Sequence, residues 1–354
     1  MMRPCIIALA LAATAAVMSP AAASAETAVT GYPSSLAALG DSITRGYDAD
    51  GVYPPGERLQ YSWAEGTSTT VDSFYLRLLA ANPAISGHAL NDAVTGAKMT
   101  DLAAQATNAV SQHAQEVVIL MGANDVCTPA EASMTSVVDF KTQFTAGLTM
   151  LTRGLPDARI YVLSIPNVYH LWQILHTNAT ARFVWSAASI CQSMLANPSS
   201  TASADVQRRA AVLQREQDFD TQLKQVCARY VHCRFDQDAL FNYSFLAGDA
   251  NTLDYFHPSI SGQTKLAAVE WSDSFNFTDI TPPVSSATFA VVTGGVKATL
   301  SATDNVGVAG IEYKIGTGIY KRYTKPVTVL TGRTITWRAV DLNGNIEATH
   351  THTA

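Results

Sequence analysis

The feature that most restricts the fold is an alternation of short apolar runs with longer helix-like patterns between residues 35 and 279. A short apolar run bounded by turn residues is typical of a buried strand. Strands that alternate with helices at this spacing pair in parallel, with helices on both faces of the sheet. We therefore expect a three-layer αβα sandwich around a parallel sheet of about five strands. The expected strands are 36–39, 85–90, 117–121, 160–164 and 231–235, and the expected helices are 73–81, 99–112, 137–153, 205–229 and 260–274.

The beginning of the chain has a different character. Arg3 precedes an apolar stretch at 5–17, and Ala-Ser-Ala at 23–25 matches a signal-peptide cleavage pattern. The stretch is too short to span a membrane as a helix. We expect residues 1–25 to be a signal peptide, a mature secreted protein that begins near Glu26, and no transmembrane segment.

A composition break at Thr281-Pro282-Pro283 separates a second, β-rich part. Its short runs and turn residues predict a small all-β sandwich. With Thr303-Asp-Asn-Val-Gly307, it resembles the Ig-like modules appended to secreted bacterial enzymes. The aspartates of its turns could bind calcium, but turn formation is the favoured interpretation. We expect a catalytic domain over 26–280 and an accessory Ig-like domain over 281–354.

The charge of the chain is uneven. Its net charge is −6, yet residues 282–354 carry 7 basic and 4 acidic side chains. The acidic first domain argues against nucleic acid as a partner. The positive second domain could contact cell-wall polymers or glycans, or could be a spacer.

Four of the five cysteines lie outside the expected signal peptide. An even number in an exported protein suggests two disulfides, for which three pairings exist. Cys227 and Cys233 would close a short loop, so we favour that pair and, by elimination, Cys127 with Cys191. Four free thiols are the alternative, and the spacing contains no C-x-x-C zinc pattern.

Ser42 is the first candidate for chemistry. It follows the first expected strand in the tripeptide Gly40-Asp41-Ser42, and open α/β sheets bind their ligands at the carboxyl ends of strands. Gly40 permits a tight exit from the strand. A serine that opens a helix also points its backbone N–H outward, where it can help bind an anion. A bare turn is the competing interpretation.

Two further segments follow expected strands and could supply hydrogen-bond donors to an oxyanion. Asn91-Asp-Ala-Val-Thr-Gly96 offers the backbone N–H of Gly96, and Met121-Gly-Ala-Asn124-Asp125 offers the side-chain amide of Asn124. An amide donates without carrying a charge that would quench a nearby base. Alternatively, Gly96 ends a strand and Asn124 forms a capping turn.

The fourth element is Asp254-Tyr-Phe-His257-Pro258. Histidine is the natural general base near neutral pH, and an aspartate can fix its tautomer through the other ring nitrogen. Of the eight histidines, only His257 has an aspartate three residues before it.

These motifs together resemble the SGNH (GDSL-type) hydrolases, most closely the secreted actinobacterial esterases and lipases. The similarity rests on Gly-Asp-Ser-Ile-Thr-Arg-Gly46, Gly-Ala-Asn-Asp125 and Asp-Tyr-Phe-His-Pro258, in that order, within residues 35–275. One departure is that similar members carry a cysteine pair in the loop after the serine. Residues 46–72 contain none, so this loop is expected to be looser.

The resemblance implies a role for each candidate. Ser42 would be the nucleophile, His257 the base and Asp254 its partner, and the oxyanion would contact the N–H groups of Ser42 and Gly96 and the side chain of Asn124. No cofactor or metal is implied. The expected substrate is a small-molecule or lipid ester, or an acylated polysaccharide.

Three alternatives remain open. The same machinery could deacetylate a polysaccharide or hydrolyse a phospholipid. The fold could belong to a non-catalytic cell-surface or carbohydrate-binding protein, or to a metal-dependent hydrolase. Residues 46–72 and 166–204 interrupt the alternation and carry many aromatic side chains, and either set could line an acyl pocket.

Overall fold

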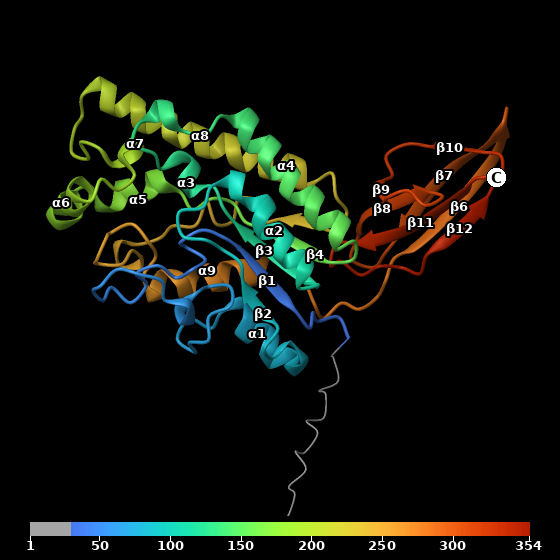
Figure 1. Cartoon of the computed structure of the whole chain (residues 1–354), viewed down its shortest axis with the longest axis horizontal. Coiled ribbons are helices and arrows are strands. Elements are labelled where there is room, and N and C mark those ends of the chain that lie inside the picture. The colour runs from blue at the N-terminus through green and yellow to red at the C-terminus, as the bar shows by residue number, and fades with distance from the viewer. Residues whose placement is uncertain (1–29) are drawn as a thin grey trace, which may run out of the picture.

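A five-stranded parallel sheet forms the centre of the larger part of the molecule (Figure 1). The computed structural model describes residues 30–354, so the expected signal peptide lies outside the described residues. The strand order is β2-β1-β3-β4-β5. The strands are β1 (Leu36–Gly40), β2 (Ala89–Asn91), β3 (Glu116–Leu120), β4 (Arg159–Val162) and β5 (Cys233–Phe235).

Helices cover both faces of this sheet. In Figure 1, α1 and α9 lie on one face, and α2, α4 and α8 pack together on the other. Every residue of β1 and β3 is buried, which explains why these strands are continuous apolar runs rather than alternating ones. The helices of the layers are α1 (Phe74–Ala81), α2 (Leu102–Ser111), α3 (Ala123–Val126), α4 (Val137–Gly154), α8 (Ser203–Cys227) and α9 (Ile260–Asp273). The expected three-layer architecture is confirmed.

Serine side chains begin several of these helices. Ser73, Ser136 and Ser259 each accept a hydrogen bond from a backbone N–H in the first turn of α1, α4 and α9. Such caps satisfy N–H groups that have no partner inside the helix. The predicted starts of these three helices lie within one residue of the observed ones.

The expected strand 85–90 was wrong over its first four residues. Residues Pro83–Ile85 form a 3₁₀ turn that Asn82 caps through a bond from the N–H of Ala84, and β2 begins only at Ala89. Ile85 is fully buried. Its apolar character therefore reflects packing into the core rather than strand formation.

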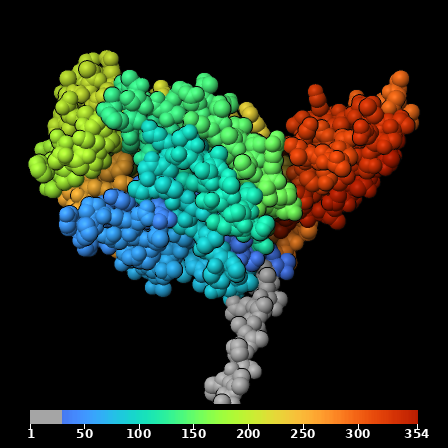
Figure 2. Space-filling view, viewed as in Figure 1, coloured from blue at the N-terminus to red at the C-terminus, as the bar shows by residue number. Residues whose placement is uncertain are grey.

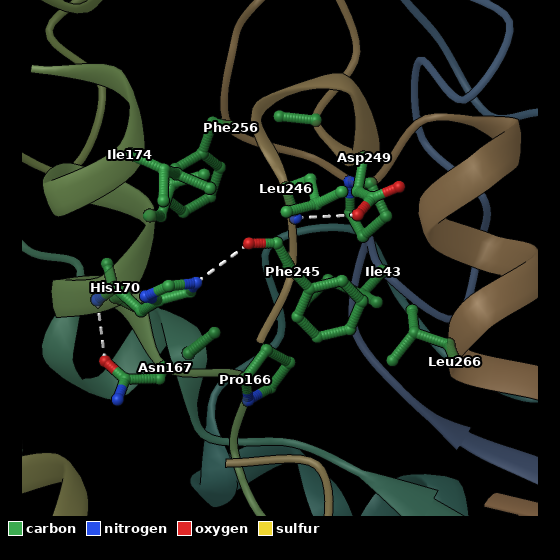
Figure 3. Close-up of a pocket in the computed structure, with 15 residues that line it drawn as sticks. Ile43, Pro166, Asn167, His170, Ile174, Phe245, Leu246, Asp249, Phe256 and Leu266 are labelled. Carbon is green, nitrogen blue, oxygen red and sulfur yellow. Dashed lines mark hydrogen bonds between the residues drawn. The ribbon is translucent and has the colours of Figure 1, made fainter. Parts of the chain in front are cut away.

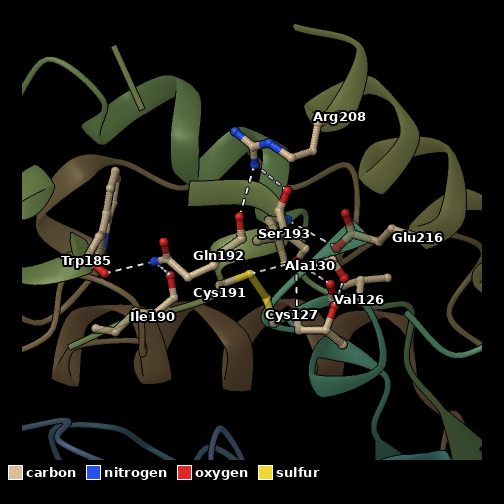
Figure 4. The surroundings of a disulfide bond; sticks show 12 residues. Val126, Cys127, Ala130, Trp185, Ile190, Cys191, Gln192, Ser193, Arg208 and Glu216 are labelled. Carbon is tan, nitrogen blue, oxygen red and sulfur yellow. Dashed lines mark hydrogen bonds between the residues drawn. A yellow bond between two sulfur atoms is a disulfide. The ribbon is translucent and has the colours of Figure 1, made fainter. Parts of the chain in front are cut away.

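The insertion at 166–204 folds into three short helices, α5 (Val168–Leu175), α6 (Ala179–Ala187) and α7 (Gln192–Leu195). The disulfide Cys127–Cys191 joins it to the end of α3 (Figure 4). Beside this bond, the hydroxyl of Ser193 donates to the carbonyl of Val126 at 2.6 Å. The second disulfide, Cys227–Cys233, closes the short loop between α8 and β5.

The loop at 46–72 is held in place without cysteines. Arg58 and Asp50 form an ion pair at 2.7 Å, and the N–H of Gly56 donates to Asp48 at 2.7 Å. Trp63 is fully buried, and its backbone N–H donates to the side chain of Gln263 on α9. Hydrogen bonds and packing therefore hold this loop in place. The missing cysteine pair had led us to expect a looser loop.

The C-terminal part is an all-β module of two antiparallel sheets, with strand orders β10-β7-β6 and β12-β11-β8-β9. Both sheets contribute to one small core that includes Leu300, Ile311, Val329 and Trp337. The predicted all-β fold is confirmed. The strands are β6 (Val284–Val292), β7 (Gly295–Thr303), β8 (Val308–Ile315), β9 (Lys321–Arg322), β10 (Val327–Leu330), β11 (Thr334–Asp341) and β12 (His350–Thr353).

The module contacts the amino-terminal edge of the parallel sheet. Arg159, the first residue of β4, donates to the carbonyl of Asn343 at 2.7 Å, and Arg338 pairs with Asp157 at 2.6 Å. His232, directly before β5, lies 3.3 Å from Glu312 of the module. The module therefore lies at the end of the domain opposite the carboxyl ends of the strands (Figure 1). Within residues 30–354, no helix has both the length and the apolar character needed to cross a bilayer.

Candidate active site

Ser42 lies just beyond the carboxyl end of β1 and is 5% exposed. The side-chain amide of Gln105 fixes the strand end, since it accepts from the N–H of Gly40 and donates to its carbonyl, both at 2.8 Å. A Cβ at Gly40 would come within 2.6 Å of the carbonyl oxygen of Leu120 on β3. Only glycine therefore lets the chain leave β1 at this point without moving the neighbouring strand.

The structure brings His257 to Ser42, although 215 residues separate them in sequence. The Nε2 atom of His257 is 2.7 Å from the Oγ of Ser42, and Nδ1 is 2.5 Å from Oδ2 of Asp254. This is the geometry in which a carboxylate orients an imidazole and the imidazole accepts a proton from a hydroxyl.

The loop of Asp254 is organised around that carboxylate. Its Oδ1 atom accepts from the N–H groups of Phe256 and His257 and from the side chain of Asn251, at 2.8 to 3.0 Å. Burial by itself would raise the pKa of Asp254, but the hydrogen bonds and the attraction to His257 outweigh it and hold that pKa below its usual value. Asp254 is therefore an anion at neutral pH.

Three donor groups lie around the same sheet edge. Among the described residues, neither the N–H of Ser42 nor that of Gly96 donates to another protein group. The amide of Asn124 donates to the carbonyl of Ala97, the residue after Gly96, at 3.0 Å. That bond uses one of its two N–H groups and ties Asn124 to the Gly96 loop. Because Ser42 follows β1 and Asn124 follows β3, these groups flank the point where the strand order reverses, which is where such sheets bind ligands.

Asp41 is buried beside Ser42 and is distinct from the histidine partner. Burial raises the pKa of Asp41 to about 6, opposed by the hydrogen bond from the N–H of Ile43. One of its carboxylate oxygens has no protein partner within the described residues. The Asp41 carboxylate thus accepts a hydrogen bond within the turn after β1, whereas the Asp254 carboxylate is hydrogen-bonded to His257.

An apolar pocket adjoins these groups and offers about 640 Å³ of space, part of it open to solvent (Figure 3). Its wall includes Ile43, directly after Ser42, and Phe256 and Pro258 on either side of His257. Leu171 and Ile174 of α5 complete it from the insertion. Of the two aromatic-rich segments, only 166–204 lines this pocket.

Sequence reasoning missed several residues that support the site. Asn251 accepts from the N–H groups of Leu253 and Asp254 through its side chain, a local turn pattern that the sequence could have suggested. Trp185 of α6 donates to the carbonyl of Tyr255 at 3.1 Å, and the Tyr47 ring lies 4.9 Å from that of His257. Nothing local marks these two contacts, because each joins distant segments.

One group of carboxylates lies apart from this site. Oxygen atoms of Asp279, Asp304 and Asp341 lie within 4.8 Å of one another where the module meets the larger domain. Asp304 and Asp341 also accept backbone N–H groups of their own turns, as the turn interpretation predicts.

Comparison with known proteins identifies the family. The model of the GDSL-like lipase/acylhydrolase family matches residues 36–269, so the chain belongs to this family, and the resemblance drawn from its motifs is confirmed. At a general level the protein is thus an ester hydrolase. No curated protein matches the chain significantly.

Solved structures that match the chain include two esterases. The acetyl xylan esterase AlAXEase is 16% identical, with 67% of this chain and 98% of that chain covered and a TM-score of 0.40. An active-site mutant of a family two carbohydrate esterase from Clostridium thermocellum is 16% identical, with 67% and 62% covered and a TM-score of 0.38.

Proposed function

We propose that the protein is a secreted serine carboxylic ester hydrolase that works through Ser42, His257 and Asp254. The observation that carries this proposal is the continuous hydrogen-bonded path from the Ser42 hydroxyl through His257 to Asp254. Secretion is supported by the two disulfides, which persist in oxidising compartments. The two separate cores support a catalytic domain over 26–280 and an Ig-like accessory domain over 281–354.

The mechanism needs only side chains and backbone groups of this chain. His257 takes the proton of Ser42 while the Ser42 oxygen bonds to the acyl carbon, and the carbonyl oxygen becomes an oxyanion. His257 then gives the proton to the departing alcohol as the ester C–O bond breaks. Water, deprotonated by His257, attacks the acyl-enzyme, and the acid leaves as the Ser42 oxygen regains a proton.

The oxyanion would be held by the N–H groups of Ser42 and Gly96 and by the side chain of Asn124. Gly96 is exposed and has a φ of +82°. Its N–H donates to no other protein group among the described residues, so it is free to donate to a substrate.

Replacing Asn124 with alanine is expected to lower kcat by about 10²–10³-fold, because loss of one oxyanion donor typically has that effect. The measurement is steady-state hydrolysis of a soluble p-nitrophenyl ester. Asn108→Ala removes an exposed amide from α2 and should retain the parent rate. If Asn124→Ala folds and turns over at the parent rate, Asn124 is no oxyanion donor.

The pocket favours an ester with an apolar acyl group over an acetyl ester. Burial of each methylene contributes about 0.8 kcal/mol, so kcat/KM should rise about three- to fourfold per added methylene until the pocket is full. A panel of acyl chain lengths, with long-chain glycerides, phospholipids and acetylated xylan, tests both the activity and the substrate class. Turnover of no ester at all would instead support a non-catalytic binding protein.

A pair of variants tests whether this pocket determines the preferred acyl-chain length. Ile174→Trp narrows the pocket and should shift the preference to shorter chains, whereas Gln173→Trp changes an exposed neighbour on the same helix and should not. A preference for acetylated xylan that Ile174→Trp leaves unchanged would favour the polysaccharide acetylesterase alternative.

A further inference from the structure

A cleft lies between the β module and the amino-terminal edge of the catalytic domain, remote from Ser42. It offers about 1140 Å³ of space, part of it open to solvent. Figure 1 shows β8 and β9 beside the end of α4, and Figure 2 shows the surface hollowed between these two parts. Its walls come from three stretches of chain, within 149–156, 229–232 and 312–322.

The cleft gathers basic side chains that have no ion-pair partners in the described part of the chain. Five basic side chains line it, and none of them forms an ion pair with a carboxylate among residues 30–354. The acid in its lining, Glu312, is buried and is paired with Arg338 at 2.6 Å. The five are Arg153, Arg229, Lys314, Lys321 and Arg322.

Both parts of the molecule contribute to this charge. Arg153 belongs to the end of α4 and Arg229 follows α8, whereas the other three belong to the module. Two of the five are held in position: Arg322 donates to the carbonyl of Ala309 at 2.5 Å, and the Lys314 ammonium lies 4.7 Å from the centre of the Tyr320 ring. Because less side-chain freedom remains to be lost, a ligand can bind such groups at lower entropic cost.

We propose that this cleft binds an anionic polysaccharide whose repeating units carry carboxylate or phosphodiester groups. Cations spread along three segments match a series of charges better than a single small anion. Repulsion from the acidic remainder of a chain of net charge −6 grows with the charge density of the ligand. It therefore opposes nucleic acid, with one charge per about 1.7 Å of duplex, more than a polysaccharide with one charge per repeating unit.

The position of the cleft separates its role from ester hydrolysis. It borders the amino ends of the strands, whereas Ser42 lies at their carboxyl ends. A polymer bound there would hold the enzyme near acylated material and raise the local substrate concentration without occupying the pocket. Binding in the cleft does not depend on the proposed chemistry at Ser42.

The test uses the full chain and a triple variant, Arg153→Gln, Arg229→Gln and Lys321→Gln, which removes three exposed charges. Binding to polygalacturonate, to a phosphomannan and to neutral xylan is measured at low and high NaCl. We expect at least tenfold weaker binding of the charged polymers by the triple variant, a smaller salt dependence, and little binding of xylan by either protein. The two charged polymers show which anionic group is preferred.

A matched control removes three exposed charges of the module that do not line the cleft, with Lys297→Gln, Lys325→Gln and Arg333→Gln. It should bind as the parent does, and all three proteins should hydrolyse a soluble ester equally. Equal loss in both triple variants would show that only net charge matters and would overturn the proposal, as would tighter binding of duplex DNA than of either polymer. A failure of hydrolysis in the parent would count against the proposed function alone.

Discussion

Alanine at Ser42 is expected to reduce kcat for a soluble ester by a factor on the order of 10⁶, close to the level of the oxyanion donors acting without a nucleophile. The hydroxyl lies 2.7 Å from Nε2 of His257, and no other side chain is hydrogen-bonded to that nitrogen among the described residues. Without the oxygen, the acyl-enzyme cannot form. The measurement is the residual rate of protein purified without contact with the parent enzyme.

A fluorophosphonate gives an independent readout of the same residue. Intact mass should show a single adduct on the parent chain, peptide mapping should place it on Ser42, and Ser42→Ala should remain unlabelled. Ser111→Ala, at an exposed position of α2, is the matched control and should label fully. An adduct on another serine, or a Ser42→Ala protein within tenfold of the parent rate, would refute the assignment.

Asparagine at Asp254 is expected to lower kcat by about 10⁴-fold with little change in KM. The amide can offer its N–H to Nδ1 of His257, which favours the tautomer that carries the proton on Nε2 and cannot accept one from Ser42. The carboxylate is suited to its role because the pKa of Asp254 is held below its usual value, so it stays charged as the pH falls toward mild acid. The measurement is kcat and KM across neutral pH.

Two controls separate catalysis from stability for this variant. Asp101→Asn removes one carboxylate at an exposed position and should keep the parent rate. A stability effect of Asp254 would be present above the pKa of the unfolded chain and lost as the pH falls through the lower folded pKa, so thermal unfolding is followed over the same range. An Asp254→Asn rate within a factor of ten of the parent at every pH would argue against an orienting role.

The fold was largely predictable because its elements carry local signals. Buried strands such as β1 and β3 read as short apolar runs, and the helices between them read as longer periodic patterns. Ile85 caused the error in the predicted start of β2, since an apolar side chain in a turn can pack into the core as well as one in a strand. The bounds of β2 therefore depended on the Asn82 cap, which competes with strand formation locally.

The candidate site was predictable to the extent that its residues follow strands or lie in short motifs. Ser42, Asn124 and His257 fall into this class. Gln105 does not, because its bonds to Gly40 join a helix interior to a strand end 65 residues away. The basic cleft could not be predicted for the same reason, because it joins segments that are distant in sequence. The sequence showed a positive module, but the contributions of Arg153 and Arg229 depend on how the two parts contact each other.

The insertion at 166–204 is joined to the site at two places, by the Cys127–Cys191 bond to the helix of Asn124 and by the Trp185 bond to the loop of His257. It also supplies Leu171 and Ile174 to the pocket. Anyone who transplants this segment into a relative to alter its chain-length preference would therefore have to move both anchors with it. A graft of α5 alone would bring the pocket residues without either anchor. Its position relative to the segments that carry Asn124 and His257 would then not be fixed.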